Sequence, residues 1–311
     1  MIASSFLPAA TQMIYDMGLQ HLLQGVTFEC PQIAAEQPKI VRCVLEGHNY
    51  SSQEIDRIFS ASKAQGKSLY YVDEPLLENI APDIIFTQDV CEVCQIDTHC
   101  TQQAIYKLPK QPQLVALSPN NLQDVFTCAI TIAQALGHEE AAYTYLAALQ
   151  QRLDKIVDTL RANKAPLRSV MLLEWIAPIY NCGHWIPYQI AYAGGVDMLS
   201  NPAGDSIVTS WDKIVRYNPE VLVIAPCGFN VDRSLQELEL LSNKPEWHQL
   251  QAVKNNAVFV ADYDLFTQPS AATLVDGSEL LAGLFHPEIF TVPSHLQQKY
   301  KALYAQQVAT H

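Results

Sequence analysis

The chain has 311 residues, a formal net charge of −13 at pH 7 and an isoelectric point near 5.0, with 49% hydrophobic and 16% charged residues. These values predict a folded chain rather than a disordered one, and its 19 lysines and arginines form no basic run of the kind that nucleic-acid binding needs. The length suits two domains of about 130–150 residues each, and no apolar run reaches the roughly 18 residues of a transmembrane helix.

The first half of the chain alternates short apolar runs with helical patterns. Strands are predicted at residues 1–5, 23–28, 69–72, 84–87 and 114–117, and helices at 8–19 and 51–64. Thr11 is a candidate N-cap of the first helix. In the second helix Ile55, Ile58 and Phe59 fall on one face. Apolar runs bounded by proline and polar residues are typical of parallel strands that helices cover on both faces.

A long helical pattern separates the two halves. An apolar stripe runs from Asn121 to Gly137, and a second pattern over residues 139–163 continues without a turn signal until Pro166. A helix of that length spans about 37 Å, so we expect it to connect two domains and to limit hinge motion between them. The expected organisation is an N-terminal α/β lobe at residues 1–137, an interdomain helix at 138–165 and a C-terminal α/β lobe at 166–311.

The second half restarts the alternation of strands and helices. Strands are predicted at residues 169–175, 221–225 and 257–261, and helices at 187–193, 210–217, 233–242 and 270–285, followed by an exposed terminal helix at 294–307. The alternation predicts an α/β fold in both halves.

Two of the predicted strands end in cysteine. They are PDIIFTQDVCEVC at residues 82–94 and PEVLVIAPCG at residues 219–228. Ligands of open α/β sheets bind outside the carboxyl ends of the strands, so these two ends predict two walls of one cleft. Five cysteines are predicted to follow strand ends in this way: Cys30, Cys91, Cys94, Cys182 and Cys227.

Three interpretations of these cysteines stay open. They are thiolate ligands of zinc or an iron–sulfur cluster, with Cys91, Cys94, Cys182 and Cys227 as the candidate set, or thiols that contact a bound cofactor, or small residues that line a pocket. Cys91-x-x-Cys94 has no second such motif to complete a zinc site.

Aromatic residues and one histidine accompany the cysteines. His184 is a candidate metal ligand, including for the cobalt of a corrinoid, and Trp185 is a candidate apolar wall for a flat macrocycle. The alternative is that His184 caps a helix or lies in solvent and Trp185 packs in the core. Phe229 and Phe266 also lie in predicted loops beside strand ends, and several aromatic residues around a cleft suit a large, partly apolar ligand.

The chain shows no pattern typical of an enzyme. It contains no glycine-rich phosphate loop and no GxSxG motif. The residues after Cys94 do not predict a helix whose dipole would activate a thiol. Residues 1–8 contain no basic segment of a secretory signal, so the chain as given is expected to be cytoplasmic, and periplasmic if a leader has been removed.

Nine features in order resemble one known family. They are Leu7-Pro8-Ala9-Ala10-Thr11, Gly25-Val26-Thr27, Cys30-Pro31, Pro82-Asp83-Ile84-Ile85, the long helix, Gly194-Gly195-Val196-Asp197, Ser210-Trp211, Pro219-Glu220-Val221-Leu222-Val223, and residues 261–269. The chain resembles the helical-backbone class of ABC-transporter substrate-binding proteins. It is most similar to the cobalamin-binding proteins, in a cysteine-rich branch without an obvious leader.

The resemblance implies two Rossmann-like lobes joined by one long helix, with a corrinoid or related metal chelate bound between them and no catalysis. It also implies that Glu78 and Asp212 dock onto arginines of a membrane permease. The hypothetical ligand contacts are Pro8, Thr11, Cys30, Gln88, Cys91, Cys94, Cys182, His184, Trp185, Cys227, Phe229 and Phe266. The segment from Gln88 to Cys94 departs from the aromatic and small polar residues of the cobalamin-binding proteins. The alternative function is therefore a cytoplasmic metal or iron–sulfur protein on the same scaffold.

Overall fold

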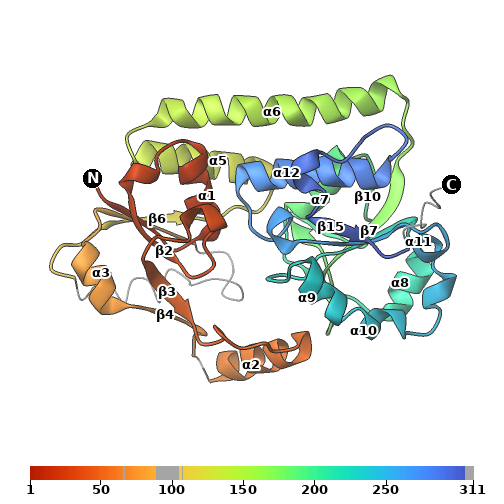
Figure 1. Cartoon of the computed structure of the whole chain (residues 1–311), viewed down its shortest axis with the longest axis horizontal. Coiled ribbons are helices and arrows are strands. Elements are labelled where there is room, and N and C mark those ends of the chain that lie inside the picture. The colour runs from red at the N-terminus through yellow and green to blue at the C-terminus, as the bar shows by residue number, and fades with distance from the viewer. Residues whose placement is uncertain (66, 89–104, 107, 305–311) are drawn as a thin grey trace, which may run out of the picture. The chain divides into compact units, whose positions relative to one another are not determined.

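The computed structural model describes residues 1–65, 67–88, 105–106 and 108–304. The chain forms two α/β lobes joined by one long helix, α6 (Glu139–Ala162) (Figure 1). Unit 1 comprises residues 1–50, 54–150 and 270–272, and unit 2 comprises residues 51–53, 151–269 and 273–311. The division falls inside α6, so this helix begins in unit 1 and ends in unit 2.

Unit 1 contains a six-stranded sheet. Its strands are β1 (Ala3–Ser5), β2 (Leu23–Thr27), β3 (Lys39–Cys43), β4 (Tyr70–Val72), β5 (Ile84–Gln88) and β6 (Gln113–Leu117). The order in the sheet is β4-β3-β2-β1-β5-β6, and every pair is parallel except β3 with β4. The chain thus builds outward from β1 in one direction and then returns to place β5 on the other side of β1.

Strand β3 was absent from the sequence-based prediction. It reads KIVRC, so two charged residues interrupt the apolar run. The Arg42 guanidinium is held by the Glu46 carboxylate at 2.8 Å, and the Lys39 ammonium donates to the carbonyl oxygens of Ala34, Ala35 and Gln37. Because these charged side chains have local partners, the segment forms a strand, although its hydrophobic pattern does not predict one.

Helices alternate with the strands of this half of the chain. They are α1 (Pro8–Asp16), α2 (Ser52–Ala64), α3 (Glu74–Ile80) and α5 (Leu122–Ala135), with short 3-10 turns η1 (Gln20–Leu22) and η2 (Gln32–Ala34). Helix α1 packs against α5 (Figure 1). The α5 cap matches its sequence, because the Asn121 side chain accepts a hydrogen bond from the backbone N–H of Asp124 at 3.0 Å. Its apolar stripe is buried, as the sequence predicts.

The predicted cap of α1 is wrong. The N-cap is Leu7, and Pro8 occupies the first helical turn, where its missing N–H costs no hydrogen bond. Thr11 lies inside the helix, and its hydroxyl donates to the Leu7 carbonyl oxygen at 3.1 Å.

Unit 2 contains a larger mixed sheet. Its strands are β7 (Arg168–Trp175), β8 (Tyr180–Asn181), β10 (Gly195–Val196), β12 (Ile207–Val208), β13 (Val221–Ile224), β14 (Val258–Ala261) and β15 (Tyr300–Ala302). The order is β12-β8-β7-β13-β14-β15, and β10 also pairs with the start of β7. The parallel pairs are β10 with β7, β7 with β13 and β13 with β14. A separate pair is formed by β9 (Gly183–His184) and β11 (Asn201–Pro202).

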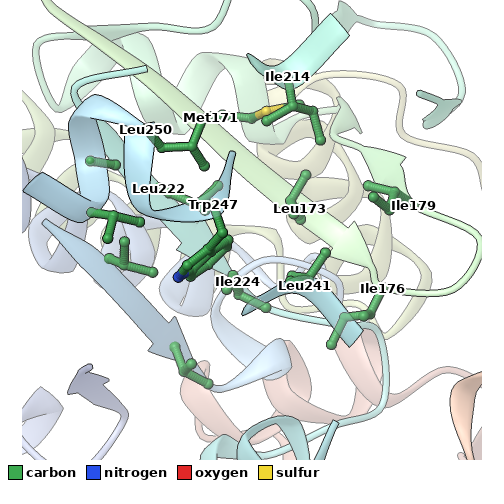
Figure 2. Packing of buried hydrophobic residues seen from close by; sticks show 14 residues of the cluster. Met171, Leu173, Ile176, Ile179, Ile214, Leu222, Ile224, Leu241, Trp247 and Leu250 are labelled. Atoms are coloured by element: carbon green, nitrogen blue, oxygen red, sulfur yellow. The ribbon is translucent and has the colours of Figure 1, made fainter. Parts of the chain in front are cut away.

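The helices of unit 2 surround a core around one tryptophan. They are α7 (Ile186–Tyr192), α8 (Trp211–Tyr217), α9 (Val231–Gln236), α10 (Glu239–Ser242), α11 (Gln251–Lys254) and α12 (Ala271–Phe285), with 3-10 turns η3 (Trp247–Gln249), η4 (Tyr263–Leu265) and η5 (Ser294–Leu296). Figure 2 shows Trp247 among Leu222, Ile224 and Leu241. Its indole N–H donates to the Tyr304 hydroxyl at 2.9 Å.

Two predicted helices of unit 2 are wrong. Residues 233–242 form two short helices, α9 and α10, because the chain turns at Glu237 and Leu238. Residues 294–304, the described part of the second predicted helix, do not form one helix. After η5 the chain adds β15 antiparallel to β14, because the edge of β14 offers backbone groups that need hydrogen-bond partners.

Candidate functional site

The strand order locates a candidate site in each unit. An open α/β sheet forms a ligand crevice outside the carboxyl ends of the two strands at which the order reverses. In unit 1 these strands are β1 and β5. In unit 2 they are β7 and β13, because β10 and β13 lie on opposite sides of β7.

In unit 1, several predicted contacts lie at these strand ends. Pro8 and Thr11 follow β1, and both are buried at the start of α1. Gln88 is the last residue of β5 and is half-buried. Cys91 and Cys94 come directly after this point and lie outside the described residues.

Cysteines also follow the neighbouring strands of unit 1. Cys30 lies three residues after β2, is half-buried, and its thiol donates to the Ala34 carbonyl oxygen at 3.3 Å. Cys43 ends β3, where burial raises the pKa of its thiol. Cys128 lies on the apolar stripe of α5, and burial raises its pKa to about 12. Cys43 and Cys128 are therefore protonated at neutral pH, whereas metal ligation and nucleophilic chemistry require the thiolate.

Glu29 lies directly before Cys30, and its carboxyl group has a strongly raised pKa. Burial, together with the nearby Glu46 carboxylate, raises its pKa to about 7. Desolvation and a like charge both disfavour the ionised form. The side chain therefore exchanges a proton near neutral pH beside a candidate strand end.

In unit 2, aromatic residues gather at the carboxyl ends of β7 and β13. Trp175 ends β7, and Phe229 follows β13; their ring centroids are 5.2 Å apart. The Cys227 backbone N–H donates to the Glu174 carbonyl oxygen at 2.9 Å, which joins the two strand ends. Cys227 is half-buried and Phe229 is buried. We call Trp175, Phe229 and Arg233, which lies over the Phe229 ring, the strand-end cluster.

His184 and Trp185 form a second aromatic pair in unit 2. Their rings stack with centroids 5.2 Å apart. Burial lowers the pKa of His184, and Asp205, whose carboxylate lies 3.9 Å from Nε2, opposes this only in part. A neutral imidazole is the form that ligates metals. The His184 Nδ1 atom is buried without a hydrogen-bond partner among the described residues.

The Trp185 indole N–H donates to the Phe266 carbonyl oxygen at 2.6 Å. The Phe266 side chain itself is fully buried. Phe266 therefore positions Trp185 through its backbone, while its ring belongs to the core.

Cys182 does not lie on a surface of unit 2, contrary to the predicted cleft position. Its side chain is fully buried, with Sγ 3.7 Å from the Asp197 carboxylate. Burial, followed by the nearby Asp197 charge, raises the pKa of this thiol. Asp197 also accepts hydrogen bonds from the backbone N–H groups of Leu172 and Leu199. Cys182 is therefore a core residue packed on a buried carboxylate that holds the β7 region together.

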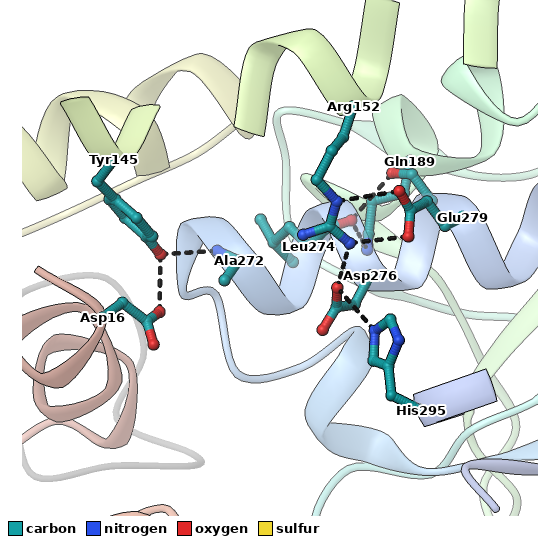
Figure 3. A network of polar contacts seen from close by, with 10 residues as sticks. Asp16, Tyr145, Arg152, Gln189, Ala272, Leu274, Asp276, Glu279 and His295 are labelled. Atoms are coloured by element: carbon teal, nitrogen blue, oxygen red, sulfur yellow. Dashed lines mark hydrogen bonds and ion pairs between the residues drawn. The ribbon is translucent and has the colours of Figure 1, made fainter. Parts of the chain in front are cut away.

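Among the described side chains, Cys182 and Cys227 belong to no group of three potential metal ligands. Such a group is formed by Asp276, Glu279 and His295, whose ligand atoms lie within 4.8 Å of one another. The Arg152 guanidinium donates to Glu279 at 2.8 and 3.0 Å and also contacts Asp276 (Figure 3). His295 Nε2 lies 3.4 Å from Asp276. Because Arg152 already pairs with both carboxylates, we interpret this group as an ion-pair network that ties α6 to α12 within unit 2.

The same figure shows a hydrogen-bonded contact within unit 1. The Tyr145 hydroxyl donates to the Asp16 carboxylate and accepts from the Ala272 backbone N–H, both at 2.9 Å (Figure 3). These bonds tie α1 and the start of α12 to α6.

The two predicted docking acids are both exposed. Glu78 lies in the last turn of α3. Asp212 lies in the first turn of α8, where the helix dipole favours a carboxylate.

Two Rossmann-like lobes joined by a single long helix, each with a candidate site at the reversal of strand order, are the architecture of a two-lobed binding protein. Residues 65–265 match the family model of periplasmic binding proteins, and the chain belongs to this family. No curated protein sequence matches the chain. Among the described residues, none of the helices has both the length and the apolar character that crossing a membrane requires.

Solved structures share this fold. A periplasmic heme-binding protein from Pseudomonas aeruginosa has a TM-score of 0.70 at 17% identity, with 93% of each chain covered. An ABC-type Fe3+-hydroxamate transport system protein from Saccharomonospora viridis has a TM-score of 0.66 at 15% identity, covering 91% of this chain and 92% of that chain. A periplasmic vitamin B12 binding protein from Vibrio cholerae has a TM-score of 0.61 at 16% identity, covering 92% and 96%.

Sequence reasoning missed two residues near the candidate site of unit 2. Arg233 and Glu237 lie four residues apart at the end of α9 and form an ion pair at 2.6 Å. Opposite charges four residues apart on a helix indicate an ion pair, so the pair itself could have been predicted from the sequence. What it cannot reveal is that Arg233 lies over Phe229 and that Glu237 is buried.

Proposed function

We propose that this chain binds a corrinoid of the cobalamin type, or a related metal chelate, as the substrate-binding protein of an ABC-type uptake system or as a cytoplasmic relative of one. The proposal is supported mainly by the position of the aromatic and cysteine side chains. They lie at the strand ends where the sheet order reverses, which is where this architecture binds ligands. Similar folds are those of proteins described as binding heme and vitamin B12.

The chemistry of unit 2 suits a flat chelate. Trp175 offers a half-buried aromatic surface, and aromatic faces of this kind bind planar apolar ligands. The neutral imidazole of His184 would be able to ligate the metal of a bound chelate, and Cys227 would be able to do so as a thiolate.

The test is titration with cyanocobalamin, haem and a ferric hydroxamate, followed by calorimetry and visible absorption. We expect saturable binding of cyanocobalamin at one site. Trp175→Leu should weaken it by about tenfold, since a lost aromatic contact is worth about 1–1.5 kcal/mol. Trp211→Leu is the matched control, because Trp211 packs on Trp247 rather than at the strand ends. Failure to bind any of the three chelates contradicts the proposal.

The alternative is a metal or iron–sulfur protein that uses the strand-end cysteines. Its support is that Cys30 and Cys227 are both half-buried at strand ends. Visible absorption and metal analysis of protein purified without oxygen separate the two functions. Tightly held iron or zinc in stoichiometric amount, without added chelate, favours the alternative.

In the transport form of the proposal, Glu78 and Asp212 dock onto a permease. Both are exposed carboxylates, one on each unit. Replacing both by alanine should weaken binding to a candidate permease by about tenfold at low salt, because charge pairs at interface rims contribute mainly to association. The measurement is surface plasmon resonance. Replacing the exposed acids Asp154 and Asp158 of α6 removes the same charge, and an equal loss from that control contradicts specific docking.

A further inference from the structure

Arg233 is the cation of the strand-end cluster. Its guanidinium lies 4.4 Å from the centroid of the Phe229 ring, and its side chain is 19% exposed. Phe229 in turn packs against Trp175 at the end of β7. An arginine in this position would ordinarily recruit a carboxylate of a ligand, since guanidinium and carboxylate groups match in charge and geometry.

Glu237 cancels that charge from inside the unit. Its Oε1 atom accepts a hydrogen bond from Arg233 Nη2 at 2.6 Å and another from the Ser52 backbone N–H at 2.8 Å, and Ser52 groups with unit 2. The side chain is buried. Its Oε2 atom has no hydrogen-bond partner among the described residues, so Arg233 is the cation that compensates this buried carboxylate.

The neighbouring strand end repeats this arrangement. Lys299 is held by Asp262 at 3.1 Å and Asp264 at 2.7 Å, directly after β14. Asp262 also accepts a hydrogen bond from the Val231 backbone N–H at 2.8 Å, which connects it to the start of α9. The two cations at these strand ends are therefore matched by three carboxylates, so a ligand carboxylate finds no uncompensated positive charge in either pair.

We propose that Glu237 is a specificity-determining residue. By pairing with Arg233 it favours a chelate with an uncharged, amide-bearing periphery and disfavours one that carries carboxylates. A ligand carboxylate near Arg233 must displace Glu237 or lie close to its like charge, and both are unfavourable at short range. Amide groups accept hydrogen bonds from Arg233 without that penalty. This inference rests on the proposed function and names the ligand class of the same site.

The test compares ligands that differ only in charge. Cyanocobalamin is compared with its monocarboxylic acids, in which one peripheral amide is hydrolysed, and haem is compared with its dimethyl ester. Of whichever pair the wild-type protein binds, it should bind the uncharged compound about tenfold more tightly than the carboxylate compound. Glu237→Gln keeps the Oε1 acceptor for Ser52 and Arg233 but removes the charge, and should bring the ratio of the two dissociation constants close to one.

Two further variants show whether the effect is local. Glu239→Gln removes the same charge from an exposed position two residues away and should leave the ratio unchanged. Adding Arg233→Gln to Glu237→Gln should abolish the improved binding of the carboxylate ligand. A general loss of folding would change the affinity for both members of a pair and leave their ratio unaltered.

The outcomes separate this inference from the proposed function. A protein that binds one of the pairs but shows no charge preference, or the same ratio in Glu237→Gln as in the wild type, overturns the role of Glu237 and leaves the proposed function standing. A wild-type preference for the carboxylate member also overturns it. If the wild-type protein binds none of these compounds and no ferric hydroxamate, the proposed function is contradicted, and the role of Glu237 with it.

Discussion

Replacing Arg152 by alanine should lower the free energy of unfolding by about 2–3 kcal/mol, since truncating one partner of a hydrogen-bonded charge pair leaves the other side uncompensated. Arg152 donates two hydrogen bonds to Glu279 and a third to Asp276. The hydrogen bond to Glu279 is the main reason that the pKa of Arg152 lies above its ordinary value, so the guanidinium stays charged. Without Arg152, two partly buried carboxylates three residues apart on α12 lie close together with no cation between them. Urea unfolding followed by circular dichroism measures the loss.

Arg161→Ala provides the control on the same helix. Arg161 is 78% exposed, and its contact with Asp158 is 3.8 Å long. An exposed pair of this kind contributes less than about 0.5 kcal/mol. Equal losses from the two substitutions would show that the network does not stabilise the contact between α6 and α12.

Glu29→Gln should raise the free energy of unfolding at pH 8 by about 2 kcal/mol and have little effect near pH 4. Each unit of pKa shift corresponds to about 1.4 kcal/mol. The expected gain is smaller than the full shift implies, because the side chain is partly exposed to solvent. The pKa of Glu29 is raised from 4.5 to about 7 in the folded protein. Between these values the folded state binds more protons than the unfolded state, so stability falls as the pH rises from about 4.5 to about 7. Glutamine removes the penalty of the buried charge.

The measurement is the free energy of unfolding of the wild type and the variant at several pH values. Glu36→Gln removes the same charge from an exposed position of unit 1 and is the control. A difference between Glu29→Gln and the wild type that stays constant from pH 4 to pH 8 would contradict the raised pKa of Glu29.

Much of the fold followed from local patterns. Proline precedes the run IIFTQ at β5 and flanks the run VLVI at β13 on both sides, and both runs form parallel strands inside their sheets. The unbroken helical pattern after Gly137 forms α6. Strand β3 was missed because it contains charged residues. Strand β15 was missed because it forms only by pairing with the free edge of β14.

The candidate site was predictable in outline only. Cys227 and Phe229 follow the end of β13, as expected, because position after a buried strand is a local property. The burial of Cys182 was not predictable, since it depends on Asp197, a residue 15 positions away. The charge balance of the strand-end cluster was not predictable either, since it depends on which face of α9 is buried.

The sequence by itself determined the alternation of strands and helices, the long helix and the family, because each depends on periodicity or on motifs contiguous in the chain. Only the tertiary structure decided which polar groups meet. Arg152 reaches Asp276 across 124 positions, and Arg233 lies over Phe229 beside a carboxylate that is withdrawn from water. The physical reason is that periodicity reports which face of an element is buried, whereas ion pairs and ligand contacts depend on distances between elements that no local pattern encodes.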